Sequence, residues 1–197
     1  MKFIQHRINK IADLTHLNPT YGAEIDLRTD VNQTSSIHLS HDPWAKGDSL
    51  IDWLDQYKKN KIQGTIIFNT KEDNLEDEVL RLCKQYEIDN FFFLDTALPT
   101  FIKYSQTDLS HLFACRLSKY ESYDFIKQFA GKITWVWADC FNGVSLSEQL
   151  LEEVSKKFKI CLVSPELQKQ PIDSINSFKV LKPFVTSICT KRPDLWG

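Results

Sequence analysis

Short apolar runs alternate with stretches of helical periodicity along almost the whole chain. Runs rich in β-branched and aromatic residues predict eight strands, at about residues 3–7, 22–28, 64–69, 90–95, 111–117, 133–138, 160–164 and 185–189. Apolar residues at helical spacing predict helices between them, at 48–57, 75–86, 98–104, 120–129, 145–158 and 172–181. Asp48 is expected to cap the first helix, and an extended segment at 36–41 to continue the second strand or to pair with it.

Buried strands that alternate with helices favour a parallel sheet covered by helices. Eight such units that close on themselves make a (β/α)₈ barrel, the TIM barrel. An open doubly wound sheet is the alternative, but the glycine-rich phosphate loop expected after its first strand is missing from this sequence. At 197 residues the chain is short for a barrel. We therefore predict one compact α/β TIM-barrel domain over residues 1–197, without a sizeable inserted subdomain.

The composition is ordinary for a globular protein, with 25% charged residues, 42% hydrophobic residues and a formal net charge of -2. This charge gives no reason to expect nucleic acid as a partner. The sequence begins without an apolar signal-peptide core and contains no run of the roughly 20 apolar residues that cross a bilayer. Its five cysteines are widely spaced and form no metal-finger motif, so we expect reduced, apolar thiols and a cytoplasmic protein. No pattern indicates an oligomeric state.

Polar residues gather where the predicted strands end, which is where barrel enzymes hold their active sites. Glu24 and Asp26 point to the same side of the second strand, and neighbouring carboxylates repel each other unless a positive charge lies between them. The other polar side chains near strand ends are His6, Arg7, His41, Asp42, Asn69, Lys71 and Asp95. Each also has an ordinary explanation, because a histidine at a strand end is commonly structural and the two acids could form salt bridges with Arg28 or Lys71.

Three short motifs follow one another, namely His6-Arg7, Glu24-Ile25-Asp26 and His41-Asp42, and the chain closes on Thr190-Lys-Arg-Pro-Asp194. In this order and at these separations they resemble the motifs of the glycerophosphodiester phosphodiesterases. That family belongs to the phosphatidylinositol-phospholipase-C-like phosphodiesterase superfamily. The resemblance spans nearly the whole chain.

The chain departs from the family's pattern at three positions. Ile8 follows His-Arg where the family usually has glycine, and Lys191 stands where the closing signature has aspartate. The third strand carries Asn69-Thr-Lys71 where the family usually has Glu-x-Lys, with the glutamate as a metal ligand. The family often inserts a subdomain between the second and third strands, and that segment is short here.

The resemblance implies a TIM-barrel phosphodiesterase that uses one divalent cation, Mg²⁺ or Ca²⁺ with Mn²⁺ as a further option. Its substrate would be a small glycerophosphodiester-like molecule. The resemblance assigns His6 and His41 as the catalytic acid–base pair, Arg7 and Lys71 as phosphate ligands, and Glu24, Asp26 and Asn69 as metal ligands. An amide oxygen suits a hard cation but brings one negative charge fewer, and Asp95 is the alternative third carboxylate.

Two other outcomes stay open at this point. One is a catalytically weak or inactive barrel relative that binds a phosphorylated ligand or a protein partner. The other is an enzyme that releases a cyclic phosphate, because in this superfamily the attacking hydroxyl is often adjacent to the ester.

Overall fold

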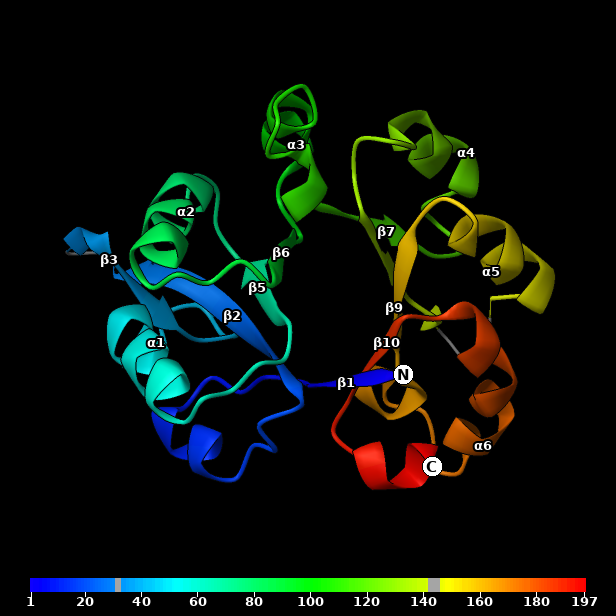
Figure 1. The fold of residues 1–197 in the computed structure, drawn as a ribbon, viewed down its shortest axis with the longest axis horizontal. Helices are drawn as coiled ribbons and strands as arrows, with labels where there is room; N and C mark the ends of the chain where they lie inside the picture. The colour runs from blue at the N-terminus through cyan, green and yellow to red at the C-terminus, as the bar shows by residue number, and fades with distance from the viewer. Residues whose placement is uncertain (31–32, 142–145) are drawn as a thin grey trace. The chain divides into compact units, whose positions relative to one another are not determined.

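The computed structural model describes residues 1–30, 33–141 and 146–197, and it divides into two compact units (Figure 1). The N-terminal unit comprises Ile4–Ile102, and the C-terminal unit comprises Met1–Phe3 together with Lys103–Gly197. Each unit combines parallel strands with helices, so the chain is mixed α/β, as the alternating pattern predicts.

The sheet of the N-terminal unit holds four parallel strands in the order β1, β2, β5, β6. Their bounds are Lys2–Gln5 for β1, Gly22–Asp30 for β2, Ile66–Thr70 for β5 and Phe91–Leu94 for β6. In the register of β2 with β5, Asp26 lies beside Asn69. Helices α1 (Leu50–Lys59) and α2 (Glu76–Gln85) cover one face of this sheet, and α3 (Leu98–Tyr104) leads into the C-terminal unit (Figure 1).

An antiparallel arm extends from β2, which pairs with β3 (Gln33–Leu39), and β3 pairs in turn with β4 (Asp48–Ser49). The extended segment predicted at 36–41 therefore pairs with the second strand rather than continuing it. The N-cap of α1 is Ser49, whose hydroxyl accepts a hydrogen bond from the Asp52 N–H, so the expectation for Asp48 is wrong. The Asp48 carboxylate instead accepts a bond from the Ile11 N–H, 2.7 Å away.

The sheet of the C-terminal unit is also parallel, with neighbouring strands β7, β8, β9 and β10. Their bounds are Ala114–Leu117, Trp135–Ala138, Lys159–Val163 and Ser187–Thr190. The Lys2 N–H donates to the Thr186 carbonyl, which attaches the first residues of the chain beside β10. Helices α4 (Tyr123–Ile126), α5 (Glu148–Ser155) and α6 (Ser174–Phe178) lie on one side of this sheet (Figure 1).

Several segments predicted as longer helices or strands contain 3₁₀ turns. The 120–129 helix is α4 followed by η3, and the 172–181 helix is α6 followed by η6, which contains Pro183, a residue without the N–H that an α-helix needs. The 111–117 strand starts late because η2 occupies its beginning. Ser145, the predicted start of the fifth helix, lies outside the described residues. The 3₁₀ segments are η1 (Ile11–Thr15), η2 (Ser110–Leu112), η3 (Lys127–Phe129), η5 (Pro165–Gln168), η6 (Lys179–Phe184) and η7 (Pro193–Trp196).

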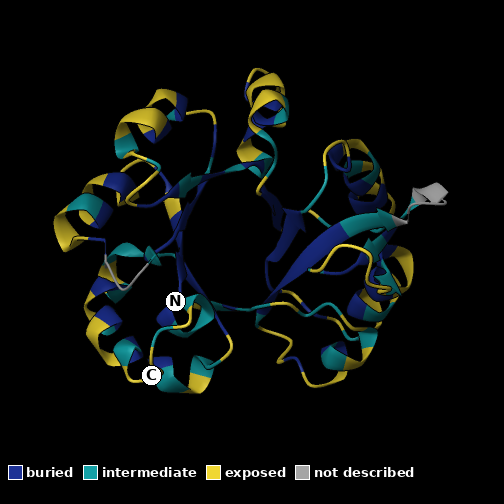
Figure 2. Cartoon of the chain, turned by 180° about the vertical axis from the view of Figure 1, so that it is seen from behind, coloured by how far each residue is buried: buried dark blue, intermediate teal, exposed yellow. Residues whose placement is uncertain are grey.

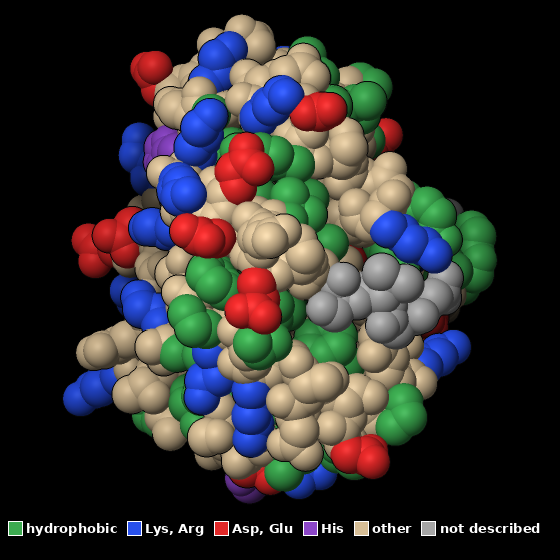
Figure 3. All heavy atoms as spheres, turned by 90° about the vertical axis from the view of Figure 1, so that its right-hand side faces the viewer, with side chains coloured by type: hydrophobic (Ala, Val, Ile, Leu, Met, Phe, Trp, Pro, Cys, Tyr) green, Lys and Arg blue, Asp and Glu red, His purple; other side chains and the backbone are tan. Residues whose placement is uncertain are grey.

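The core of each unit lies along its parallel strands, most of whose residues are buried, while the helices expose one side (Figure 2). Every residue of β5, β6 and β8 is buried. All five cysteines are buried thiols that form no disulfide, as expected. On the face drawn in Figure 3, acidic and basic side chains are interspersed with hydrophobic ones. The helices in the described part of the chain are all too short and too polar to cross a bilayer.

Candidate active site

Two fully buried carboxylates on β2 form the centre of the site. Glu24 and Asp26 each have an exposed fraction of 0%, and they alternate with the buried apolar residues Ile25 and Leu27. This period-two pattern confirms that both acids share one face of the strand. Burial of two neighbouring charges is unfavourable unless polar and positive groups surround them, so the contacts of these carboxylates decide what the site can do.

The loop after β1 is fastened to β2 by backbone and side-chain bonds. The Arg7 N–H donates to Glu24 Oε2 at 2.8 Å, and the Ile8 N–H donates to the Glu24 carbonyl at 2.9 Å. Arg7, with φ of 57°, adopts the left-handed conformation, and the Trp53 indole donates to the Ile8 carbonyl at 2.9 Å. The left-handed conformation falls on Arg7 and not on residue 8. Position 8 therefore does not need a glycine, and isoleucine fits there.

Asn9 makes two hydrogen bonds to one residue of the acid pair. Its Nδ2 donates to Asp26 Oδ2 at 2.8 Å, and its Oδ1 accepts from the Asp26 N–H at 2.9 Å. No motif in the sequence singles out this asparagine, and sequence reasoning missed it. Its two bonds fix the Asp26 side chain relative to its own backbone.

Burial is the main reason that Glu24 is hard to ionise. Burial and, to a smaller extent, the neighbouring Asp26 charge raise the pKa of Glu24 from 4.5 to about 7. Hydrogen bonds from Asn69 Nδ2, at 2.8 Å from Oε1, and from the Arg7 N–H act in the opposite direction, as does the Lys71 charge. The local cations therefore compensate this carboxylate only in part.

Lys71 extends from the end of β5 between two acids. Its Nζ lies 3.2 Å from Asp26 Oδ1 and 3.8 Å from Asp95 Oδ2, and Arg7 Nε lies 3.7 Å from Asp26 Oδ2. The predicted phosphate ligands Arg7 and Lys71 thus both lie beside the carboxylate pair. Asp95 is thus an ion-pair partner of Lys71 in this arrangement.

The two predicted catalytic histidines have different surroundings. His6 Nε2 lies 3.7 Å from Glu24 Oε2, and the His6 side chain is 16% exposed. His41 is 42% exposed, and its Nδ1 lies 2.7 Å from Asp42 Oδ1. The hydrogen bond with His41 holds the pKa of Asp42 below its usual value.

His41 is tied to β2 through its backbone. Arg28 donates from Nε and Nη2 to the His41 carbonyl at 3.3 and 3.1 Å, and Arg28 Nη1 lies 3.3 Å from Glu72 Oε1. The preceding Ser40 N–H donates to the Asp26 carbonyl at 3.0 Å. His6, Arg7, Asn69 and Lys71 thus contact the carboxylate pair directly, whereas His41 is joined to it through neighbouring backbone.

The donor set suits a hard divalent cation. Among the described residues no three His, Cys, Asp or Glu side chains gather around one point, so a third protein oxygen has to come from another residue type. Asn69 Oδ1 is buried and, within the described part of the chain, has no hydrogen-bond partner. Two carboxylates and an amide oxygen are ligands that Mg²⁺ and Ca²⁺ accept, so the residues fit the implied metal.

The acids of the C-terminal unit are engaged with their own neighbours. Asp139 forms an ion pair with Arg116 and accepts from Gln168, while Glu166 accepts from Ser164 and Thr190. The closing motif is engaged as well, because the Arg192 N–H donates to Thr190 Oγ1 at 2.9 Å and the Arg192 side chain pairs with Asp194 at 2.7 Å. The closing motif, which resembles the family signature, therefore forms a hydrogen bond and an ion pair among its own residues.

No protein-family model and no curated protein sequence matches the chain. Solved structures do match it over almost its full length. A protein from Galdieria sulphuraria, assigned as a glycerophosphodiester phosphodiesterase, aligns with a TM-score of 0.72 at 15% identity and covers 99% of this chain and 95% of its own. An Oleispira antarctica phosphodiesterase in complex with the product sn-glycerol-3-phosphate aligns with a TM-score of 0.69 at 11% identity, covering 100% and 95%. A glycerophosphodiester phosphodiesterase from Agrobacterium tumefaciens gives 0.66 at 11% identity, covering 100% and 98%. The chain therefore has the fold of these proteins.

Proposed function

We propose that this protein is a metal-dependent phosphoric diester hydrolase of the glycerophosphodiester phosphodiesterase type, acting on a small glycerophosphodiester-like substrate. The observation that carries the proposal is the buried Glu24–Asp26 pair with Arg7 and Lys71 beside it and a histidine at its edge. The shared fold adds support, because one of the similar structures holds sn-glycerol-3-phosphate as its product. The five reduced cysteines are compatible with action in the cytoplasm.

We also propose that the eight parallel strands close into a TIM barrel. Each unit supplies four of them in chain order, and the fold likeness extends over 99% or more of the chain. In such a barrel the strand ends that carry His6, Asp26 and Lys71 would open on the catalytic face.

The carboxylates and the amide would hold the cation. Glu24, Asp26 and Asn69 supply its oxygen ligands, and the bound cation would polarise a phosphoryl oxygen and offset the charge that develops in the transition state. Asn9 keeps Asp26 in place through its two hydrogen bonds. Arg7 and Lys71, which contact Asp26 in the free protein, would turn their charges toward the substrate phosphate.

The histidines would move the protons. One imidazole removes the proton of the attacking hydroxyl while the other protonates the departing alkoxide. Asp42 orients the His41 ring through its bond to Nδ1, and Arg28 holds the His41 backbone, so this imidazole has a defined position despite its exposure. Glu24 Oε2 lies 3.7 Å from His6 Nε2 and would help to orient this imidazole.

Hydrolysis assays test this proposal. Purified protein with Mg²⁺, Ca²⁺ or Mn²⁺ should cleave glycerophosphodiesters, excess chelator should abolish the activity, and re-addition of the cation should restore it. His6→Ala and His41→Ala should each lower the rate by about a hundredfold or more. His16→Ala, which alters an exposed histidine elsewhere in the same unit, should leave it unchanged.

The assays also separate the alternatives. Phosphorus NMR of the products distinguishes a phosphomonoester from a cyclic phosphate. Absence of turnover with every cation and substrate, together with retained binding of a glycerophosphodiester in calorimetry, would overturn the enzymatic proposal in favour of a binding protein.

A further inference from the structure

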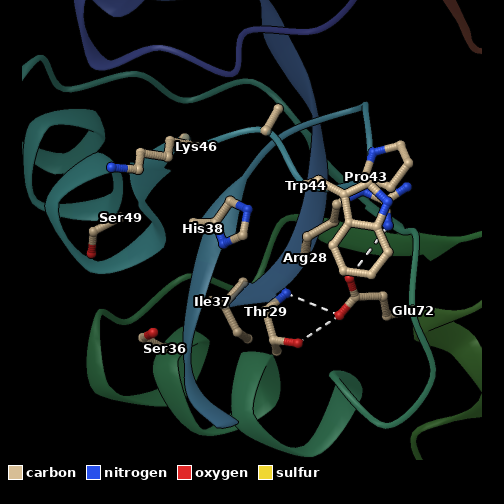
Figure 4. A pocket seen from close by; sticks show the side chains of 12 residues that line it. Arg28, Thr29, Ser36, Ile37, His38, Pro43, Trp44, Lys46, Ser49 and Glu72 are labelled. Atoms are coloured by element: carbon tan, nitrogen blue, oxygen red, sulfur yellow. Dashed lines mark hydrogen bonds and ion pairs between the residues drawn. The ribbon is translucent and has the colours of Figure 1, made fainter. Parts of the chain in front are cut away.

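A pocket with both polar and apolar lining residues lies in the N-terminal unit, beside the candidate active site. Its volume is about 770 Å³, and the arm formed by β2 and β3, the segment that follows His41 and the turn after β5 line it (Figure 4). The residues that matter for its chemistry are Arg28, His38, Trp44, Lys46, Ser49 and Glu72. In the close view His38 lies between Lys46 and Ser49 on one side and Arg28 and Trp44 on the other (Figure 4).

Pocket residues adjoin active-site residues along the chain and through hydrogen bonds. Arg28 follows Asp26 by two positions on the same face of β2, which is about 7 Å along a strand. The Arg28 guanidinium donates two bonds to the backbone carbonyl of His41, and Glu72 directly follows Lys71. A substrate whose phosphate lies at Lys71 and His41 would therefore extend one of its two alcohol groups toward this pocket.

Glu72, the acid in the pocket wall, already accepts hydrogen bonds from Thr29 and Arg28. Glu72 Oε2 accepts from the Thr29 N–H at 3.0 Å and from Thr29 Oγ1 at 2.6 Å, and Glu72 Oε1 accepts from Arg28 at 3.3 Å. Partial burial alone would raise the pKa of Glu72, but these bonds hold it below the usual value. Glu72 is therefore ionised and paired, and it offers little to a cationic ligand.

The hydrogen-bond donors of the pocket, in contrast to the Glu72 carboxylate, can still bind a ligand. Arg28 has five N–H groups and makes three hydrogen bonds within the described part of the chain. His38 Nε2 is buried and has no hydrogen-bond partner among the described residues. Lys46 is exposed, so its flexible stem can bring the ammonium over the opening. The charges of Arg28 and Glu72 cancel each other, so Lys46 gives the pocket a net positive charge.

Trp44 adds an apolar wall at the entrance. Its side chain is 86% exposed, and its backbone, with φ of 66°, adopts the left-handed conformation that is uncommon for residues with a bulky side chain. An indole in this position can cover the carbon skeleton of a bound alcohol. An indole can also attract a quaternary ammonium, but Lys46 and Arg28 would repel that group here.

We propose that this pocket is the subsite for the alcohol on the far side of the scissile phosphate, and that it selects an alcohol bearing a second anionic group, a phosphate or a carboxylate. The proposal rests on the proposed function, because it assumes that a phosphodiester occupies the neighbouring site. Lys46 and the free N–H groups of Arg28 bind the second anion, His38 donates to it, and Trp44 covers the carbon atoms between the two anionic groups.

Steady-state kinetics with a matched substrate pair tests the selection. Glycerophosphoglycerol and the same diester carrying a terminal phosphate differ only in the second anion. Wild-type protein should show a KM about tenfold lower for the phosphorylated diester, as expected for one charge-assisted contact. Lys46→Glu should remove this preference, so that the KM values of the two diesters differ by less than about twofold. Lys59→Glu, which reverses an exposed lysine on α1, should keep the preference.

A binding measurement separates this proposal from the enzymatic one. Calorimetry with glycerol 1-phosphate on wild-type protein, Lys46→Glu and Trp44→Ala needs no turnover. Weaker binding to both variants supports the subsite, even if neither diester is hydrolysed, in which case only the proposed function fails. Hydrolysis of both diesters with equal KM, equal binding to all three proteins, or a preference for glycerophosphocholine over the phosphorylated diester would overturn the subsite and leave the proposed function intact.

Discussion

Both units place acids on or just beyond their parallel strands, but the surroundings of those acids differ. In the C-terminal unit, Asp139 is 3% exposed and pairs with Arg116 and Gln168, and Glu166 accepts bonds from Ser164, Thr190 and the Lys191 N–H. In the N-terminal unit, Glu24 and Asp26 lie side by side, and the groups around them leave the pKa of Glu24 raised to about 7.

Position near a strand end is therefore a weak indicator of catalysis. The stronger indicator is a buried charge whose neighbours compensate it only in part, since such a group gains most from a ligand that brings opposite charge. Asp139 and Glu166 are each held by an ion pair or by hydroxyl donors, whereas Glu24 and Asp26 lie beside each other and Asn69 Oδ1 has no hydrogen-bond partner among the described residues, which leaves room for a cation. Four substitutions test whether this difference between the two units has functional consequences.

The largest effect is expected from the acids themselves. Asp26→Asn should lower kcat/KM by about a thousandfold, or about 4 kcal/mol of transition-state stabilisation, because the cation and the phosphate-binding cations lose their common anchor. Asp139→Asn should lower the melting temperature while kcat/KM stays within a few-fold of wild type. An equal loss of activity in both variants would remove the distinction between the two regions.

The second-largest effect is expected on the pH dependence of the free energy of unfolding. In excess chelator, the folded protein binds a proton at Glu24 that the unfolded chain releases between pH 4.5 and about 7. The free energy of unfolding should therefore fall as the pH rises through this window, by about 3 kcal/mol from this group.

The matched variant for this measurement is Glu24→Gln, which lacks the titrating group. Urea unfolding at pH 5 and pH 8 should show the loss in wild-type protein and a smaller one in Glu24→Gln, and added cation should restore wild-type stability at pH 8. Identical pH profiles for the two proteins would show that Glu24 ionises normally.

Asn69→Glu should strengthen cation binding by about tenfold to thirtyfold, because a carboxylate replaces an amide among the ligands. In chelator the same variant should melt at a lower temperature than wild type, since three acids then share one buried site. Calorimetric titration and thermal unfolding measure the two effects. Unchanged affinity would mean that residue 69 does not bind the cation. Asp95 would then be the candidate for the third ligand.

The smallest effect is expected at Asn9. Asn9→Ala removes both bonds to Asp26, and the loss of such a supporting contact should lower kcat/KM by about tenfold. Weaker cation binding should accompany it. Asn18→Ala removes an asparagine that bonds Thr20 in an exposed turn and serves as the control. Equal activity of the two variants would show that Asn9 has only a structural role.

Strand periodicity and motif spacing predicted the centre of the site. The alternation Glu24-Ile25-Asp26 on a buried strand determined which face the acids share, and the parallel neighbour brought Asn69 and Lys71 beside them. The same local patterns predicted most strands, because short apolar runs have few other ways to be buried. They did not distinguish α-helical from 3₁₀ geometry in the C-terminal unit, where short segments and Pro183 decide the outcome.

Contacts that depend on the path of a loop could not be predicted in this way. Asn9 reaches Asp26 only because the chain turns at Arg7, and Arg28 reaches the His41 carbonyl only because β3 folds back along β2. Neither contact follows a helical or strand period. The pocket beside Trp44 depends on the same arm, so its charge balance became apparent only in three dimensions.

Calorimetric titration of Mg²⁺, Ca²⁺ and Mn²⁺ into chelator-treated protein tests the central claim most directly. We predict one cation per chain for wild-type protein, binding weakened by at least about tenfold in Glu24→Gln and in Asp26→Asn, and unchanged binding in Asp139→Asn. No saturable binding of any of the three cations to wild-type protein, or binding that survives in both Glu24→Gln and Asp26→Asn, would contradict the claim that the buried acid pair on β2 is a metal site.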